Sequence, residues 1–224
     1  MVYLFVIIIT FIAYFISLKL KARFSISLLN PVLVSMVTII ILLKVLRIDI
    51  EYYQSGSHII TDLLGPIIIV LAVPLYRKKE LLKKNWMAIT IGIITSIIVS
   101  FTTVYGFSKI FSFEKLLINS LLPKSVTTPL ALESLEIIGG YPPVTILAVI
   151  LTGITGALLA PLVMRLFKIE SELAKGIGIG ASSHAIGTSK AIEMSEEAGA
   201  ASGLALGLSG IVTVIVLTIL SLLK

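Results

Sequence analysis

Two short polar stretches interrupt apolar segments of this chain, and their sequences resemble each other. One is Pro-Lys-Ser-Val-Thr-Thr-Pro-Leu-Ala-Leu-Glu at residues 123–133, and the other is Ser-Ser-His-Ala-Ile-Gly-Thr-Ser-Lys-Ala-Ile-Glu at residues 182–193. Thr128 recurs as Thr188 after 60 residues, and one alanine and two glutamates recur at the same spacing. Broken helices in corresponding positions of a repeat are a sequence sign of a transporter's binding site. The pattern therefore predicts a binding site built from both stretches.

The chemistry of such a site follows from the way in which each helix restarts. Thr128 is an N-cap candidate followed by Pro129 at the first helical position, and Thr188 is an N-cap candidate followed by Ser189. Two helix N-termini that meet at mid-membrane present free N–H groups and positive dipole ends, which suit a small carboxylate. Neighbouring hydroxyl groups add hydrogen bonds. The predicted substrate-binding residues are Ser125, Thr127, Thr128, Pro129, Ser183, His184, Gly187 and Thr188.

Ionisable side chains in and beside these stretches are candidates for coupling transport to an ion. An imidazole titrates near neutral pH, so His184 can carry a proton, although a structural hydrogen bond that holds the break explains its presence equally well. Glu133 and Glu193 lie about one and a half turns into the restarted helices. They can take part in coupling or simply pair with Lys124 and Lys190. The sequence leaves open whether the ion is a proton or sodium.

The composition is that of a membrane protein with many spans. Of 224 residues, 57% are hydrophobic and 13% are charged, and the mean hydropathy is +1.10. Soluble domains carry roughly 25% charged residues, so lipid is the main solvent of this chain. The net charge of +6 comes from basic residues in short loops, which are topology signals and contacts to anionic lipid. We expect an all-α polytopic protein in the lipid bilayer, with no nucleic acid as a partner.

The residue pattern points to neither a cofactor nor a metal. The chain has no cysteine, and its two histidines have no metal-ligand spacing. The glycines of residues 176–180 follow no strand, so we expect them to pack helices and not to bind a dinucleotide. An intramembrane hydrolase that uses Ser182 or Ser183 beside His184 is a weak alternative, because no second catalytic constellation accompanies them. We expect a protein that is not an enzyme.

Eight hydrophobic segments of roughly spanning length, about 17–25 residues, follow one another along the chain. They lie near residues 2–18, 28–46, 58–76, 87–107, 111–138, 143–167, 171–198 and 200–223. We expect residues 1–110 to form a transmembrane scaffold. Residues 111–224 form the expected transport core, with repeat copies at 111–167 and 171–224. The fifth and seventh segments contain the two polar stretches.

Basic loops predict the orientation of these segments. Lysine and arginine gather at residues 19–23 and again at residues 77–84. The positive-inside rule places both loops in the cytoplasm. The N-terminus and a loop at residues 49–58 are then external. We expect a multi-pass protein of a bacterial or archaeal plasma membrane.

Each interrupted segment can be one discontinuous crossing or a re-entrant hairpin that enters and leaves on the same side. An arm spans roughly 16–18 Å, about half of the hydrocarbon core. Hairpins separated by the sixth segment alone enter from opposite faces, which gives the inverted repeat of alternating access. They also keep Arg165, Lys168 and Lys175 in the cytoplasm. Hairpins are favoured, while crossings and plain surface loops stay open as alternatives.

The chain resembles the LrgB/CidB family of holin-like bacterial membrane proteins, which is related to the plastid glycolate/glycerate transporter. The motifs that carry the resemblance are Leu64–Tyr76, Leu122–Pro129, Ile138–Gly140, Thr152–Gly156 and Ser183–Thr188. The resemblance implies a link to murein hydrolase control and lysis. It also implies a small holin-like LrgA/CidA-type protein as a partner.

Two functions fit these observations. The first is secondary transport of small monocarboxylates, of the pyruvate, glycolate or glycerate type that the resemblance implies, by alternating access at the tips of two broken helices. The alternative is a holin-like pore component or a regulator of murein hydrolase activity and cell lysis. The matched helix starts favour the carrier, because a simple pore needs no such pair. We also expect a homo-oligomer.

Overall fold

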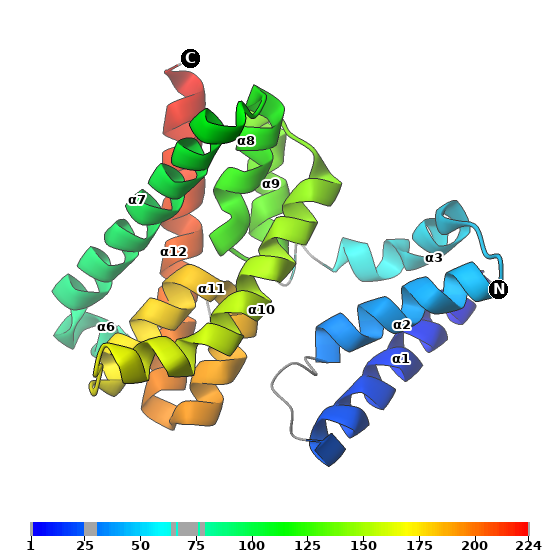
Figure 1. The fold of residues 1–224 in the computed structure, drawn as a ribbon, viewed down its shortest axis with the longest axis horizontal. Coiled ribbons are helices and arrows are strands. Elements are labelled where there is room, and N and C mark those ends of the chain that lie inside the picture. Colours follow the sequence, from blue (N-terminus) through cyan, green and yellow to red (C-terminus); the bar gives the residue numbers. More distant parts are fainter. Residues whose placement is uncertain (1, 25–30, 64–65, 67–75, 77–78, 224) are drawn as a thin grey trace. The chain divides into compact units, whose positions relative to one another are not determined.

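The computed structural model describes residues 2–24, 31–63, 66, 76 and 79–223. Every regular element in this part of the chain is a helix, as predicted (Figure 1). The chain forms two compact units, Met1–Ile67 and Ile68–Lys224. The functional division at residue 110 into a scaffold and a transport core stays a prediction.

In the described part of the first unit, α1 contacts both α2 and α3. The hydroxyl groups of Thr10 on α1 and Tyr53 on α3 lie 2.8 Å apart and form a hydrogen bond. The bounds of these helices are Val2–Phe24 for α1, Pro31–Val45 for α2 and Ile50–Asp62 for α3.

Residues 49–58 do not form an irregular loop as predicted, because α3 occupies nearly all of them, and their external location stays a prediction. Asp49 has extended backbone angles, and its carboxylate accepts a hydrogen bond from the N–H of Glu51 at 3.2 Å. This N-cap satisfies a backbone donor that a helix start would otherwise leave without a partner. Much of the third predicted segment, residues 58–76, lies outside the described residues.

The second unit contains the other helices that the structure describes. Figure 1 shows α7, α10 and α12 as its long helices, with the shorter α8 and α9 at one end. The short helix η1 is a 3₁₀ turn between α8 and α9. The bounds are Lys79–Lys84 for α6, Trp86–Phe111 for α7, Lys115–Leu121 for α8, Leu122–Ser125 for η1, Thr128–Ile138 for α9, Pro142–Leu166 for α10, Glu172–Met194 for α11 and Glu196–Leu222 for α12.

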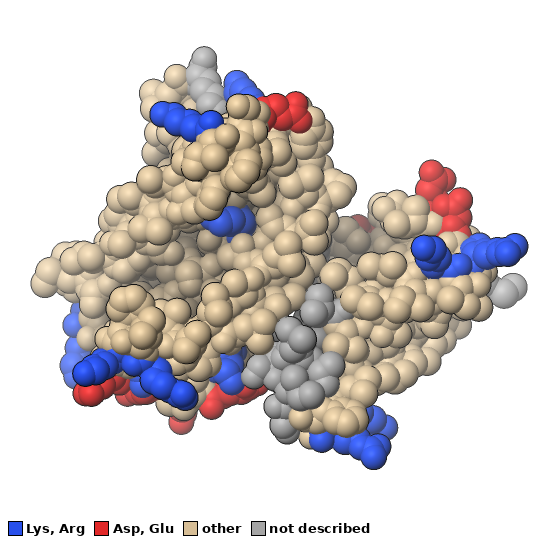
Figure 2. All heavy atoms as spheres, viewed as in Figure 1, with Lys and Arg blue, Asp and Glu red and all other residues tan. Residues whose placement is uncertain are grey.

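Four of the described helices are long and apolar enough to cross a membrane. Figure 2 shows the charged side chains of the second unit gathered mainly at its two ends, with a largely uncharged surface between them. This distribution is what a bilayer requires of a spanning bundle. The four stretches are Tyr3–Phe24 in α1, Trp86–Phe111, Pro142–Leu166 and Glu196–Leu222, and Val34–Val45 in α2 is a shorter apolar helix.

Glycines let α11 approach α12 until their backbones touch. A Cβ at Gly176 would lie 2.4 Å from the Ala198 carbonyl oxygen, and one at Gly180 would lie 2.2 Å from that of Ser202. Small residues allow this close packing between helices in lipid, where van der Waals contact is a main source of association. The glycine run at residues 176–180 therefore packs helices, as expected.

The boundary between the last two helices differs from the predicted segments 171–198 and 200–223. Ser195 has extended backbone angles (φ −164°, ψ 159°), so α11 ends at Met194 and α12 begins at Glu196. The Ser195 hydroxyl oxygen accepts a hydrogen bond from the N–H of Ala198 at 3.0 Å. A serine N-cap followed by two glutamates is a typical helix start, and the apolar pattern alone conceals it.

Candidate functional site

The chain reverses direction between α8 and α9. The end of α9 lies against the second half of α8, because the Asn119 side chain donates a hydrogen bond to the Ile138 carbonyl. The backbone N–H of Tyr141 donates to the Ser120 hydroxyl at 2.7 Å. The chain therefore turns back through η1, and the end of α9 returns to the side of α8.

A second reversal lies inside α11. Ser183 (φ −133°, ψ 16°) and His184 (φ 42°, ψ −141°) have non-helical backbone angles that break the helix. The two ends of α11 lie together, because the Ser195 hydroxyl donates to the Glu172 carboxylate. Hydrogen bonds from Lys175 and then Ser195 hold the pKa of Glu172 below its usual range.

Polar contacts from three helices hold the break in α11. A break leaves carbonyl groups without helical donors, and in lipid they need other partners. The Ala181 carbonyl accepts hydrogen bonds from Ser96 on α7 at 3.0 Å and from Ser209 on α12 at 3.4 Å. The His184 ring donates through Nε2 to the Val149 carbonyl on α10 at 2.8 Å.

Two glycines of the Thr-Gly-Ile-Thr-Gly motif on α10 make room for this break. A Cβ at Gly153 would lie 2.5 Å from the His184 ring. A Cβ at Gly156 would lie 1.8 Å from the Ser183 hydroxyl oxygen. The motif thus accommodates the two residues that interrupt α11.

Both reversals meet α7 on neighbouring turns. Ser96 donates a hydrogen bond to the Ala181 carbonyl at the second reversal. Ser100 lies one helical turn further along α7. The Ser100 hydroxyl accepts a hydrogen bond from the Lys124 ammonium at 2.7 Å and pairs with the Ser125 hydroxyl at 3.2 Å. Residues that are far apart in the sequence therefore converge on one face of α7.

A groove of about 510 Å³ runs along this face of α7. Hydroxyl groups make up most of its polar lining, and Lys124 is the one charged side chain among the described residues that line it. The polar lining residues are Thr95, Ser96, Ser100, Thr103, Lys124, Ser125, Thr152 and Ser182.

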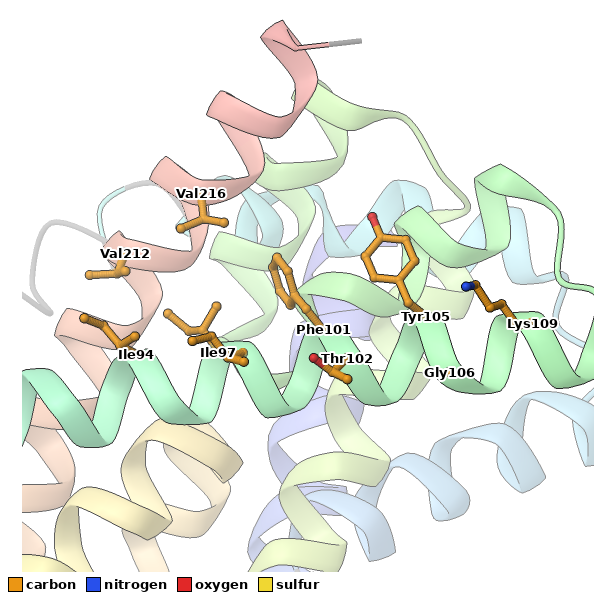
Figure 3. A pocket seen from close by; sticks show the side chains of 10 residues that line it. Ile94, Ile97, Phe101, Thr102, Tyr105, Gly106, Lys109, Val212 and Val216 are labelled. Carbon is orange, nitrogen blue, oxygen red and sulfur yellow. The ribbon is translucent and has the colours of Figure 1, made fainter.

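A second groove, of about 560 Å³, lies between α7 and α12 and has a different character. Figure 3 shows Phe101 between Tyr105 on one side and Val212 and Val216 on the other, with Lys109 beyond Tyr105. This lining offers few groups that could orient a polar ligand. The hydroxyl-lined groove is therefore the better candidate for a polar binding site.

The predicted substrate residues fall into separate places. Ser125 lines the hydroxyl-lined groove. Residues 127–129 form the start of α9, and the buried Thr127 hydroxyl has no hydrogen-bond partner among the described residues. Residues 183–187 form the break and the turn after it, where Gly187 is buried against Ser183. The structure does not gather all eight around one cavity, and their role in binding substrate stays a prediction.

Both helices restart earlier than predicted, α9 by one residue and the second half of α11 by about four. Thr127 is the N-cap of α9, so Thr128 is its first residue and Pro129 its second. Thr188 lies inside α11, where its hydroxyl donates to the His184 carbonyl at 2.8 Å and pairs with Ser202 at 2.8 Å. The helix restarts directly after His184, because the break needs only two residues.

The predicted coupling residues occupy three environments. His184 is buried, and its ring is engaged with α10. Glu193 is exposed and pairs with Lys190 at 2.9 Å, and Glu133 is exposed on α9. Coupling through any of them stays a prediction. Lys124 is a site residue that the sequence analysis does not include, although it lies beside Ser125 in the first polar stretch.

Comparison with known proteins identifies relatives along almost the whole chain. The model of the LrgB-like family matches residues 10–223. The holin-like protein CidB of Staphylococcus epidermidis RP62A is 33% identical over 217 residues, which cover 97% of this chain and 95% of CidB. CidB of Staphylococcus aureus Mu50 is 33% identical over 220 residues, 98% of this chain and 96% of CidB. Protein YxaC of Bacillus subtilis 168 is 36% identical over 191 residues, 85% of this chain and 83% of YxaC. No solved structure matches.

Proposed function

This chain belongs to the LrgB-like family, and from that premise we propose that it acts as a holin-like protein that makes the plasma membrane permeable to small solutes. It is a multi-pass protein of the bacterial plasma membrane. The observation that carries the proposal is the similarity to proteins named holin-like over 97% of the chain. The names of the relatives described above record no transport activity. The holin-like function is therefore better supported than the carrier function that the sequence favoured.

Assembly with other chains is part of this proposal. The name CidB is consistent with a small LrgA/CidA-type protein as partner. A homo-oligomer is also consistent with the fold, because two grooves on α7 leave polar and apolar surface for further contacts.

A carrier for small monocarboxylates is the second candidate, and one observation favours it. Two chain reversals converge on the middle of α7 beside a hydroxyl-lined groove. A single spanning helix, α10, lies between them. This order supports re-entrant hairpins that enter from opposite faces and form an inverted repeat, as alternating access requires.

Flux through proteoliposomes separates the two candidates. Vesicles that contain the purified protein are loaded with a small fluorescent dye and exposed to labelled pyruvate. We expect the dye to leak in proportion to the amount of protein, and pyruvate entry to rise without saturation. Retained dye together with saturable pyruvate entry and counterflow would replace the holin-like function with the carrier.

Protein-free vesicles and vesicles with an unrelated spanning protein serve as controls. Co-reconstitution with a small LrgA/CidA-type protein tests the partner. Tight vesicles with neither leak nor uptake, with and without that partner, would contradict both functions.

A further inference from the structure

We propose that Lys124 is the centre of a binding site for a small, singly charged anion in the hydroxyl-lined groove of α7. The proposal adds to the carrier function, whose substrate class a short carboxylate in this groove would match, but it is argued from the contacts of the groove and is independent of the holin-like function. It concerns a residue that the sequence reasoning did not place in the site.

The depth of the Lys124 ammonium is the first argument. It donates a hydrogen bond to Ser100 at 2.7 Å, and Ser100 lies 14 residues after Trp86 and 11 residues before Phe111. At about 1.5 Å per residue, Ser100 is roughly 21 Å and 17 Å from the two ends of the spanning helix. The cation is thus held near mid-membrane, where charged side chains are rare and functional.

The charge of Lys124 is the second argument. The ion pairs found among the described residues of this unit join Glu80, Glu172 and Glu193 to lysines near them in sequence, and none involves Lys124. Its ammonium has three donors, of which the described contacts use one, on Ser100. Two donors remain for a ligand. A single uncompensated positive charge selects a ligand with a single negative charge.

The hydroxyl groups around Lys124 are the third argument. Several of them already donate elsewhere, as Ser96 does to Ala181. No hydrogen bond is found among the described residues for Thr152 on α10. The hydroxyls of Ser100 and Ser125 share one hydrogen bond, so one of their two O–H groups is still free. An anion beside Lys124 can therefore accept hydrogen bonds from the ammonium itself and from Thr152 on α10. A further hydrogen bond can come from whichever of Ser100 and Ser125 keeps a free O–H group.

The depth also decides between two sources of anionic chemistry. A lipid phosphate lies at the membrane surface, whereas Lys124 is held roughly 17 Å or more, by helix rise, from either end of α7. The ligand is therefore a small dissolved anion, such as chloride or a short carboxylate, and not a headgroup.

Line broadening of the ³⁵Cl NMR signal by the detergent-solubilised full chain tests the proposal. We expect saturable broadening that acetate reverses by competition and that the larger gluconate does not. Lys124→Gln removes the charge and should weaken chloride binding about tenfold or more. Lys124→Arg keeps the charge and should retain binding. Lys109→Gln, at the far end of α7 beside the other groove, is the matched control and should bind like the wild type.

Each outcome decides for or against the site. Equal affinity in Lys124→Gln and wild type would overturn the proposal, as would an equal loss in Lys109→Gln or the absence of saturable broadening.

Thr152→Val decides the question if Lys124→Gln does not fold. It keeps the lysine and the side-chain shape, and we expect binding several-fold weaker, by about one hydrogen bond. Unchanged affinity in Thr152→Val would contradict the geometry. Binding is measured without vesicles, so it fails or succeeds separately from membrane permeation.

Discussion

Gly180→Ala is expected to destabilise the second unit strongly. The new Cβ would lie 2.2 Å from the Ser202 carbonyl oxygen and 2.9 Å from its Cα. These are backbone atoms, which cannot rotate out of the way as a side chain can. Overpacking of a core costs about 1–3 kcal/mol, and occasionally more. We expect a loss of unfolding free energy in the upper part of that range. It would be detected as a lower unfolding temperature in detergent.

Gly203→Ala on the neighbouring helix α12 is the matched control. A Cβ at Gly203 meets no atom within 4 Å. Alanine is the better helix former by roughly 1 kcal/mol, so this variant should be as stable as the wild type or slightly more so. If Gly180→Ala unfolded at the same temperature as Gly203→Ala, the close contact of α11 with α12 would be wrong.

His184→Ala is expected to have the second largest effect. The substitution removes the hydrogen bond to the Val149 carbonyl, which contributes about 0.5–1.5 kcal/mol, and empties the space beside Gly153. The substitution leaves a residue with a Cβ at φ 42° and ψ −141°, so the backbone strain is the same as in the native protein. Such backbone angles cost of order 1–3 kcal/mol for residues with a Cβ.

His184→Gly separates the strain from the hydrogen bond. Glycine loses the same ring and the same hydrogen bond, but it adopts these backbone angles without a steric cost. We expect His184→Gly to be more stable than His184→Ala by about 1 kcal/mol, from chemical or thermal unfolding. His58→Ala, on exposed α3, should leave stability unchanged. A glycine variant less stable than the alanine variant would show that the break is unstrained.

The sequence could predict the features that depend on local pattern. The all-helical membrane architecture followed from hydropathy, and glycine spacing indicated close helix packing. The non-helical residues Pro123, Ser183 and His184 lie inside the two polar stretches that the sequence marked. Whether the reversals at these places re-enter the membrane stays a proposal.

Other features depended on polar capping that hydropathy does not register. α3 follows a capping aspartate inside a segment of mixed polarity, which hydropathy does not distinguish from a loop. The Ser195 cap lies inside the predicted segment 171–198, between Glu193 and Glu196, and hydropathy does not mark it as the end of α11. In both places, one side-chain oxygen that accepts a backbone N–H sets the boundary.

The site itself depends on contacts between residues distant in sequence. Ser100 and Lys124 are 24 residues apart, and Ser96 and Ala181 are 85 apart. No local pattern in α7 predicts which of its hydroxyls face the two reversals. The sequence therefore identified the polar stretches but not the helix on which they converge, and Lys124 was treated only as a partner for a glutamate.

Disulfide formation between introduced cysteines tests the central claim, that the first reversal meets the middle of α7. The chain has no cysteine of its own, and the hydroxyl oxygens of Ser100 and Ser125 are 3.2 Å apart. A protease site at residues 112–114 allows a linked pair to be recognised on a denaturing gel. We predict that mild oxidation links Ser100→Cys to Ser125→Cys but not Thr102→Cys, which lines the other groove, to Ser125→Cys. A link through residue 102, or none through residue 100, would contradict the account.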